Sequence, residues 1–549
     1  MKDAELSVDN ILGEAWSYEA GRRLLPYDAF KWWGRRPALF IQALLLDAQG
    51  YPPGKLKWYA RQRLSHKASK VLKKLTVCDP MCGGGTTCIE ALLLGAEKVL
   101  CTDIDPSSIL VVNATLKIMS RECEDILRGI REALASTLRK TRELWCLDEF
   151  CYVHTFLTRE CDEGTCVVPR WLGTYLRKSR ALKFAITESG EIEAVENVGI
   201  DEKVEIPRKN LVEIGKGVYA YASEIYRIRS GGGVERKFVS LVKDVKVAEH
   251  LAESLKKSRN LLGATCTQIP ELKETRRLRK AGVNCWEEIF TPRQLLTLKV
   301  FLEEAASINP DSLNVAAAIV GTSIRTLSLL AFYYQPYGKM NPGLVVKSYW
   351  LPKYPTELNP LAGDLNNMKT IGRGTLLTYI KKLGKTCETY KGQKLEMDSI
   401  EVKPGNAFEF DYGNCDVVLL DPPYPGKIDY SSMTSIYSIP MSLVGREAKA
   451  NQYNVGEGVI DVHDMNKYVD QLSKLLEKIV MELKNQGKTY VLISEDDNGR
   501  RVVEALKEHL MKLNLGLNIQ EKGPFIGESP GKLGRSKTRR IVLLKIEKI

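Results

Sequence analysis

Residues 71–105 constrain the possible fold more than any other part of this 549-residue chain. The segment VLKKLTVCD ends as a short apolar strand, breaks into PMCGGG, and continues as TTCIEALLLGA with the apolar spacing of a helix. KVLCTDID then reads as a second strand that ends in acidic residues. This order of strand, glycine turn, helix, strand and carboxylate predicts the opening of a doubly wound α/β domain.

The glycine turn and the carboxylate that follows it predict a cofactor carrying a nucleoside. Gly83 and Gly85 permit close backbone approach at a helix N-terminus, and Asp103 lies where a carboxylate can accept the hydroxyls of a ribose. A dinucleotide site is the alternative, but Cys88 stands where the third glycine of G-x-G-x-x-G belongs. The pattern that remains is D-P-x-x-G-x-G, which begins at Asp79.

A second strand end carries another unusual group of residues. The apolar run CDVVLL, from Cys415, stops at Asp421-Pro422-Pro423-Tyr424. Ligands of a doubly wound sheet lie beyond the carboxyl ends of its strands, so this tetrad should face the same ligand as the glycine turn. A proline turn that merely ends a strand is the alternative, and the presence of both motifs in one chain disfavours it.

The tetrad suits chemistry on an exocyclic amino nitrogen, whose lone pair is delocalised into the ring. The Asp421 carboxylate and the Pro422 carbonyl can accept its two hydrogens and draw the lone pair out of conjugation. Prolines hold φ near −65° and lack an amide hydrogen, which keeps this carbonyl geometry stiff. Tyr424 offers a flat face for a base, a contact worth about 1–3 kcal/mol.

Together the two motifs resemble those of S-adenosylmethionine-dependent amino-methyltransferases that act on DNA, whose cofactor turn reads much like DPMCGGGTT. Three further stretches are similar to a large group of bacterial and archaeal adenine-specific DNA methylases. YDAFKWWGRRPALFIQALLL resembles their N-terminal W-W-A-R-R-P-L segment, with Gly34 in place of alanine. WEEIFTPRQLLTLKVF resembles their F-T-x-R-Q-L segment, and KSYWLPKYPTELNPLAG their W-x-x-x-E-x-N-P region. That group has an N-terminal domain of unknown function and often an internal zinc ribbon.

The resemblance implies a class I (Rossmann-like) methyltransferase, an α/β fold whose seven-stranded sheet has helices on both faces and is split by a large α+β insertion. Residues 1–120 would hold the N-terminal segment and the first half of the methyltransferase domain. Residues 121–400 would form the insertion and recognise the target. Residues 401–549 would complete the domain, including the D-P-P-Y motif and a terminal hairpin.

The resemblance also implies a site for S-adenosyl-L-methionine. Its expected residues are Asp79, Pro80, Gly83, Gly85, Thr86, Asp103, Ile104 and Asn406. Asp103 would hold the ribose, while Ile104 and Asn406 would lie near the adenine ring. Phe408 could pack on the same ring, or belong to the core instead. Asp421, Pro422, Pro423 and Tyr424 would form the catalytic tetrad.

The N-terminal aromatic and basic residues are open to two interpretations. Lys31, Trp33, Arg35 and Arg36 could contact nucleic acid or close the cofactor site, since guanidinium groups bind phosphates and carboxylates. Alternatively, an N-terminal helix packs on the sheet and leaves its basic residues in solvent. Trp32 and Trp33 are adjacent and cannot share one narrow helical face, so one should be buried and the other should line a groove.

The segment at Thr291 has a local explanation that requires no function. Thr291 is a good N-cap, Pro292 suits the first helical position, and Gln294 completes a capping box. Arg293 is therefore left out of the predicted DNA contacts.

The cysteines predict no metal site. Without a secretory signal, thirteen cysteines favour a reducing, cytoplasmic setting and thiols rather than disulfides. Of a zinc ribbon, only Cys161 and Cys166 remain at the corresponding place, so zinc is not expected. The most apolar window, VAAAIVGTSIRTLSLLAFYY, contains Arg325 and is read as a core helix rather than a membrane span.

The predicted function is methylation of DNA, with a flipped base as substrate. A net charge of +12 favours a polyanionic partner. The aspartate that opens the tetrad favours N6 of adenine, since serine often opens it in enzymes that methylate N4 of cytosine. Guanine-N2 methylation of RNA and a non-catalytic DNA-binding subunit with the same fold are the alternatives. The sequence does not identify the recognition sequence, the oligomeric state or partner proteins of a modification or defence system.

Overall fold

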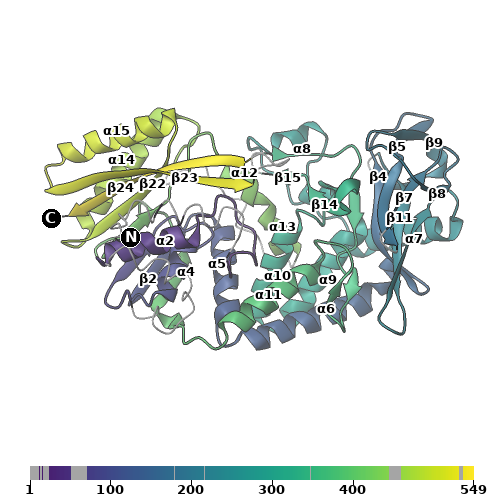
Figure 1. Cartoon of the computed structure of the whole chain (residues 1–549), viewed down its shortest axis with the longest axis horizontal. Coiled ribbons are helices and arrows are strands. Elements are labelled where there is room, and N and C mark those ends of the chain that lie inside the picture. The colour runs from purple at the N-terminus through teal and green to yellow at the C-terminus, as the bar shows by residue number, and fades with distance from the viewer. Residues whose placement is uncertain are drawn as a thin grey trace, which may run out of the picture. The chain divides into compact units, whose positions relative to one another are not determined.

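The computed structural model describes Leu12, Ala15 and residues 24–50, 71–177, 180–215, 217–345, 348–443, 459–530 and 536–548 (Figure 1). The chain forms two compact units. Unit 1 comprises Met1–Glu124, Lys385–Thr434 and Lys449–Ile549, and unit 2 comprises Asp125–Gly384 and Ser435–Ala448. The boundaries differ from the predicted 121–400, because the short segment after the D-P-P-Y motif also belongs to unit 2.

Unit 1 is built on a seven-stranded sheet in the order β20-β2-β1-β21-β22-β24-β23. The first five of these strands run parallel, and β24 runs antiparallel to both neighbours. This confirms a mixed α/β fold with a mostly parallel central sheet. The strands are β1 (Thr76–Asp79), β2 (Lys98–Asp103), β20 (Ile400–Pro404), β21 (Val417–Leu420), β22 (Lys488–Ser494), β23 (Leu517–Pro530) and β24 (Ser536–Lys548).

Helices cover both faces of this sheet (Figure 1). Successive strand residues point to opposite faces, so Val77 and Leu419 join one apolar cluster while Cys78 and Leu420 join another. The first cluster includes α2 and α4, and the second includes α14 and α15. The helices of unit 1 are α2 (Ala38–Ala48), α4 (Thr86–Leu93), α5 (Pro106–Met119), α12 (Tyr430–Thr434), α14 (Met465–Glu482) and α15 (Asp497–Lys512).

Unit 2 combines antiparallel strands with helices, and its strands precede most of its helices in the sequence. Its largest sheet contains β3 (Cys146–Leu147), β4 (Phe150–Thr158), β10 (Val212–Gly215), β11 (Val218–Ile228), β12 (Val234–Ser240) and β17 (Thr356–Leu358). Smaller sheets pair β5 (Thr165–Pro169) with β9 (Lys203–Pro207), and join β6 (Trp171–Arg177), β7 (Arg180–Ile186) and β8 (Ile192–Val195). Three two-stranded pairs are β13 (Ala331–Tyr334) with β14 (Lys339–Pro342), β15 (Leu344–Val345) with β16 (Ser348–Tyr349), and β18 (Gly363–Asp364) with β19 (Lys369–Thr370).

Two helices, α6 (Cys123–Trp145) and α11 (Leu376–Tyr390), cross the sequence boundaries between the units. The other helices of unit 2 are α7 (Val245–Leu262), α8 (Arg276–Lys280), α9 (Pro292–Ile308), α10 (Pro310–Ser323) and α13 (Ser438–Leu443). The apolar window read as one core helix is helical only as far as Ser323, and then continues through turns into β13. Within the described ranges, no helix has the length and apolar character needed to cross a membrane.

The cysteines contradict the expectation of free thiols. All thirteen lie in the described part of the chain, and twelve of them form disulfides, leaving Cys82 buried and unpaired. The bonds join Cys78 to Cys415, Cys88 to Cys101, Cys123 to Cys387, Cys146 to Cys151, Cys161 to Cys166, and Cys266 to Cys285. The prediction assumed that chains without a secretory signal keep their thiols, a rule with known exceptions.

Candidate functional site

The ends of β1 and β21 bring the two sequence motifs to one edge of the sheet in unit 1. The strands are adjacent and parallel, with Val77 opposite Val417. Asp79 is the last residue of β1, and Asp421 directly follows β21. Burial raises the pKa of Asp79 to about 7, and the charges of Asp421 and Asp103 add to this shift. Asp79 therefore lies close enough to Asp421 and to Asp103 for the charge of each to act on it.

Asp103, at the end of β2, is tied to the glycine turn. Its carboxylate accepts hydrogen bonds from the Gly83 amide at 2.7 Å and from the Asp105 amide at 2.9 Å. Burial raises the pKa of Asp103 to about 7, and the charge of Asp105 raises it further. The Asp103 carboxylate thus holds the glycine turn itself, and its predicted contact with a ribose stays a prediction.

Contacts within the protein explain why glycine stands at the positions of this turn. Gly83 and Gly85 both have positive φ, at 49° and 74°. A Cβ on Gly83 would lie 2.9 Å from Nε1 of Trp32, and one on Gly84 would lie 2.7 Å from Cζ of Arg35. Gly83 and Gly84 therefore make room for the N-terminal segment, whereas a Cβ on Gly85 would lie 2.6 Å from Cγ2 of Val112 in α5. Close approach of a ligand, the cause predicted from the sequence, is not needed to explain them.

Pro80 and Thr86 complete the turn. The Pro80 carbonyl accepts a hydrogen bond from the hydroxyl of Thr102 at 3.3 Å. Thr86 is buried as the first residue of α4, and its carbonyl accepts a bond from Tyr27 at 3.4 Å. Both residues hold the backbone of the turn in place.

Ile104 and Asn406 lie at the ends of neighbouring strands. Asp103 is opposite Pro404 in the β2–β20 pair, and the Gly405 amide donates to the Asp103 carbonyl at 3.1 Å. Ile104 is 45% exposed and directly follows the half-buried Asp103. Asn406 is half-buried. The apolar Ile104 and the amide Asn406 thus follow two adjacent strands, β2 and β20.

The Asp421 carboxylate is engaged by Arg36. Nε of Arg36 donates to Oδ2 at 2.7 Å and Nη2 donates to Oδ1 at 2.6 Å. The Tyr424 hydroxyl also donates to Oδ1, at 3.1 Å. The Arg36 guanidinium lies 4.8 Å from the centre of the Tyr424 ring. Burial alone would lower the pKa of Arg36, but the charge of Asp421 raises this pKa above its ordinary value.

The two adjacent tryptophans are both buried, with 4% of Trp32 and 1% of Trp33 exposed. The prediction that one of them lines a groove is therefore wrong. The backbone of residues 26–37 forms turns rather than a helix, so the two side chains can point in different directions. Trp32 stacks on Tyr430 with ring centres 6.4 Å apart. A Cβ on Gly34, whose φ is 69°, would lie 2.3 Å from the Tyr430 hydroxyl, which explains glycine in place of alanine.

The residues predicted to contact nucleic acid interact with other parts of the protein in this structure. Trp33 has almost no surface to offer DNA. Lys31 lies 5.9 Å from the Trp33 ring, and Arg35 donates a hydrogen bond to the Gly84 carbonyl. Together with Arg36 on Asp421, the N-terminal segment contacts both sequence motifs. Its two adjacent arginines bind the glycine turn and the tetrad respectively.

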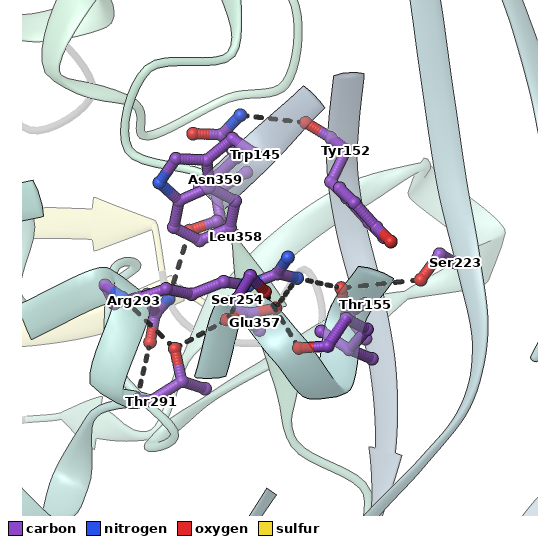
Figure 2. Close-up of polar contacts among 12 residues, drawn as sticks. Trp145, Tyr152, Thr155, Ser223, Ser254, Thr291, Arg293, Glu357, Leu358 and Asn359 are labelled. Atoms are coloured by element: carbon purple, nitrogen blue, oxygen red, sulfur yellow. Dashed lines mark hydrogen bonds and ion pairs between the residues drawn. The ribbon is translucent and has the colours of Figure 1, made fainter. Parts of the chain in front are cut away.

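A second charged cluster, in unit 2, was missed by sequence reasoning (Figure 2). Arg293 and Glu357 are both fully buried and form a bidentate pair through Nε, at 2.8 Å, and Nη2. Arg293 also donates to the Leu144 carbonyl at 3.1 Å and to the Thr155 hydroxyl at 2.9 Å. The F-T-x-R-Q and E-x-N-P motifs thus meet. The capping box at Thr291 is confirmed, but it explains only part of the motif.

Aromatic and polar neighbours enclose this second cluster. The Arg293 guanidinium lies 4.2 Å from the Trp145 ring centre and 4.4 Å from that of Tyr152. Asn359 donates to the Tyr152 carbonyl at 2.9 Å (Figure 2). A buried arginine and a glutamate 64 residues apart could have been paired from sequence only by treating the two motifs as partners.

Comparisons of the sequence with protein-family models and with curated proteins found no match. The described residues contain no group of three or more His, Cys, Asp and Glu side chains arranged to hold a metal ion. Cys161 and Cys166 are bonded to each other, so neither is a thiolate ligand in this structure.

Proposed function

We propose that this chain is an S-adenosylmethionine-dependent methyltransferase that acts on an exocyclic amino group in DNA, with N6 of adenine as the preferred target. The observation that carries the proposal is the placement of Asp79, Asp103 and Asp421 at the carboxyl ends of three adjacent parallel strands, β1, β2 and β21. The glycine turn and the D-P-P-Y tetrad lie at the same strand ends. The net charge of +12 supports a polyanionic partner.

The residues at the edge fit the cofactor. Asp79 and Asp103 have pKa values raised to about 7, because burial and the charges of neighbouring carboxylates disfavour their charged forms. A cationic ligand would offset these charges, and S-adenosylmethionine carries a sulfonium and an ammonium group. Ile104 would cover the adenine ring, with Asn406 beside it. The antiparallel pair β23–β24 supports the same proposal, since the resemblance implies a terminal hairpin.

The tetrad would prepare the target nitrogen. Bound S-adenosylmethionine would supply an electrophilic methyl carbon. The Asp421 carboxylate and the Pro422 carbonyl would accept the two N–H groups of the amine and free its lone pair for attack. Tyr424 would stack against the base, and its hydroxyl bond to Asp421 keeps the carboxylate oriented. The proton released from the nitrogen would leave through the hydrogen bond to Asp421.

Transfer of tritium from labelled S-adenosylmethionine into DNA tests the proposal, with digestion to nucleosides to identify the product. N6-methyladenine is expected, N4-methylcytosine would redirect the target, and label in RNA guanine would favour the RNA alternative. Asp421→Ala serves as the matched inactive variant. Cofactor binding without transfer to DNA or RNA would contradict the proposed activity.

One observation favours a non-catalytic DNA-binding subunit as the second candidate. Both oxygens of Asp421 are already bonded to Arg36, as they would be in a protein that had lost its chemistry. Such a subunit would bind DNA but transfer no label. The same assay, combined with a DNA-binding measurement, separates the two candidates.

A further inference from the structure

The Arg36 guanidinium presents to Asp421 the same kind of group as the proposed substrate. It is planar, and two of its N–H groups point at the two oxygens of one carboxylate at 2.7 and 2.6 Å. An exocyclic amine on a base is also planar and would donate to this carboxylate. With the Tyr424 hydroxyl on Oδ1 as well, three of about four acceptor positions of the carboxylate are used.

The same guanidinium covers the ring on which a base would stack. It lies 4.8 Å from the centre of the Tyr424 ring, within the range of a cation–π contact. Tyr424 also packs against the apolar cluster that includes α2 and α4, which limits the ring surface left for another partner. Arg36 therefore uses both the hydrogen-bonding and the stacking surface of the tetrad.

The segment that carries Arg36 is held over the tetrad by its neighbours. Trp32 stacks on Tyr430, and Gly34 fits against the hydroxyl of the same tyrosine. The side chain of Arg36 is nevertheless at the edge of the sheet, with 14% of it exposed, and that of Asp421 is 22% exposed. The pair is thus accessible to a competitor, although the backbone beside it is anchored.

We propose that Arg36 occupies the position of the target base and that a base binds only by displacing its guanidinium from Asp421 and Tyr424. This inference rests on the proposed function. Arg36 acts as a specificity-determining residue, because its contacts are lost whenever a base enters. A base presented by DNA has further contacts to offset that loss, whereas a free nucleoside has few. The enzyme would therefore reject free nucleosides.

Binding of 2′-deoxyadenosine, measured by equilibrium dialysis, tests the inference. Saturating S-adenosylhomocysteine is present to fill the cofactor site, and its own dissociation constant is measured first by calorimetry. Arg36→Met should bind the nucleoside about tenfold more tightly than the unaltered protein, as expected on removing a charge-assisted competitor. Its S-adenosylhomocysteine affinity should not change.

Two further variants make the result decisive. Arg36→Lys keeps the charge but cannot bind both carboxylate oxygens, so its nucleoside affinity should fall between the other two. It also carries the test alone if Arg36→Met does not fold. Arg293→Met removes the matched buried arginine from unit 2 and should leave nucleoside binding unchanged.

The outcomes separate this inference from the proposed function. If S-adenosylhomocysteine binds but neither Arg36 variant gains nucleoside affinity, Arg36 positions Asp421 instead of competing with the base, and the inference is overturned. If S-adenosylhomocysteine does not bind the unaltered protein and no methyl transfer is detected, the proposed function fails and the inference falls with it.

Discussion

Two bidentate arginine–carboxylate pairs occupy very different surroundings in this molecule. Arg293 and Glu357 in unit 2 are fully buried, and the guanidinium has a carbonyl, a hydroxyl and two aromatic rings around it. Arg36 and Asp421 in unit 1 lie at the edge of the sheet and remain 14% and 22% exposed. The geometry of the two pairs is similar, but only the second includes a residue of the proposed catalytic tetrad.

The difference indicates opposite roles. An enclosed pair whose groups are fully satisfied fixes the packing of its surroundings, and losing one partner leaves an uncompensated buried charge. An edge pair has a smaller desolvation penalty and can exchange one partner for another. In unit 2 the buried arginine joins two sequence motifs. In unit 1 the partly exposed position of Arg36 is what our proposal of its displacement by a base requires.

The largest expected effect comes from removing the two carboxylates in turn. Asp421→Ala should reduce methyl transfer by about a thousandfold or more, because the amine loses its acceptor, while cofactor affinity stays nearly unchanged. Glu357→Gln should leave transfer per folded molecule close to normal. Single-turnover transfer and calorimetric cofactor binding check both variants. Equal loss of transfer and cofactor affinity in Asp421→Ala would contradict its assigned role.

Stability should show the reverse order. Arg293→Met should destabilise unit 2 by about 3–5 kcal/mol, since Glu357 would remain buried without its partner. Arg36→Met should destabilise unit 1 by less, because solvent reaches both side chains of that pair. Denaturant unfolding followed by tryptophan fluorescence and by limited proteolysis of each unit measures the two effects. A larger loss of stability in Arg36→Met than in Arg293→Met would contradict the assigned difference between the two pairs.

Cofactor affinity should respond to the carboxylate beside the glycine turn. Asp103→Ala should weaken S-adenosylmethionine binding about tenfold or more, as expected when charged hydrogen bonds to a ribose are removed. Glu357→Gln, the control from the enclosed pair, should leave the dissociation constant unchanged. An unaltered constant in Asp103→Ala would refute the ribose contact.

The smallest predicted effect is a pH dependence near neutral pH, which we expect in unit 1. Burial raises the pKa of Asp79 and of Asp103 to about 7, so their contribution to stability is greatest below the ordinary carboxyl pKa and is lost as pH rises through 7. Binding of a cationic cofactor should accordingly strengthen between pH 6 and 8, with proton release on the acidic side. Calorimetry in buffers of different ionisation enthalpy measures this release. No pH dependence would mean that neither carboxylate meets a positive charge.

Unit 2 provides the contrast for this last measurement. Burial alone would raise the pKa of Glu224, but hydrogen bonds from His154 and Arg236 lower this pKa to about 2. Its contribution to stability is present above the ordinary glutamate pKa and is lost as pH falls towards 2. Thermal unfolding of the protein without cofactor, measured at pH 3, 5 and 8, should therefore show the lowest melting temperature of unit 2 at pH 3 and that of unit 1 at pH 8.

The sequence predicted the sheet of unit 1 better than the contacts at its edge. The apolar runs that end at Asp79, Asp103 and Asp421 predict strands from the residues of each run alone. The mostly parallel sheet confirms these strands. The Arg36–Asp421 bond joins positions 385 residues apart, and no local pattern specifies such a pair.

The errors have identifiable causes. Trp32 and Trp33 were assigned to opposite environments by assuming a helix, and turns allow both to be buried. The close approach of a ligand to Gly83 and Gly85 stays a prediction, and nothing in the sequence indicated that Trp32 and Val112 pack against these two glycines. The disulfides were excluded by a rule about compartments, which says nothing of whether two cysteines are brought together by the fold.

One disulfide has a practical consequence. Cys123, at the start of α6, is bonded to Cys387 in α11, 264 positions further along the chain. Both cysteines belong to unit 1, immediately outside the segment of unit 2 that begins at Asp125 and ends at Gly384. A single proteolytic cut within that segment would therefore leave the two pieces covalently attached. They would migrate as one species on a denaturing gel until a reductant is added.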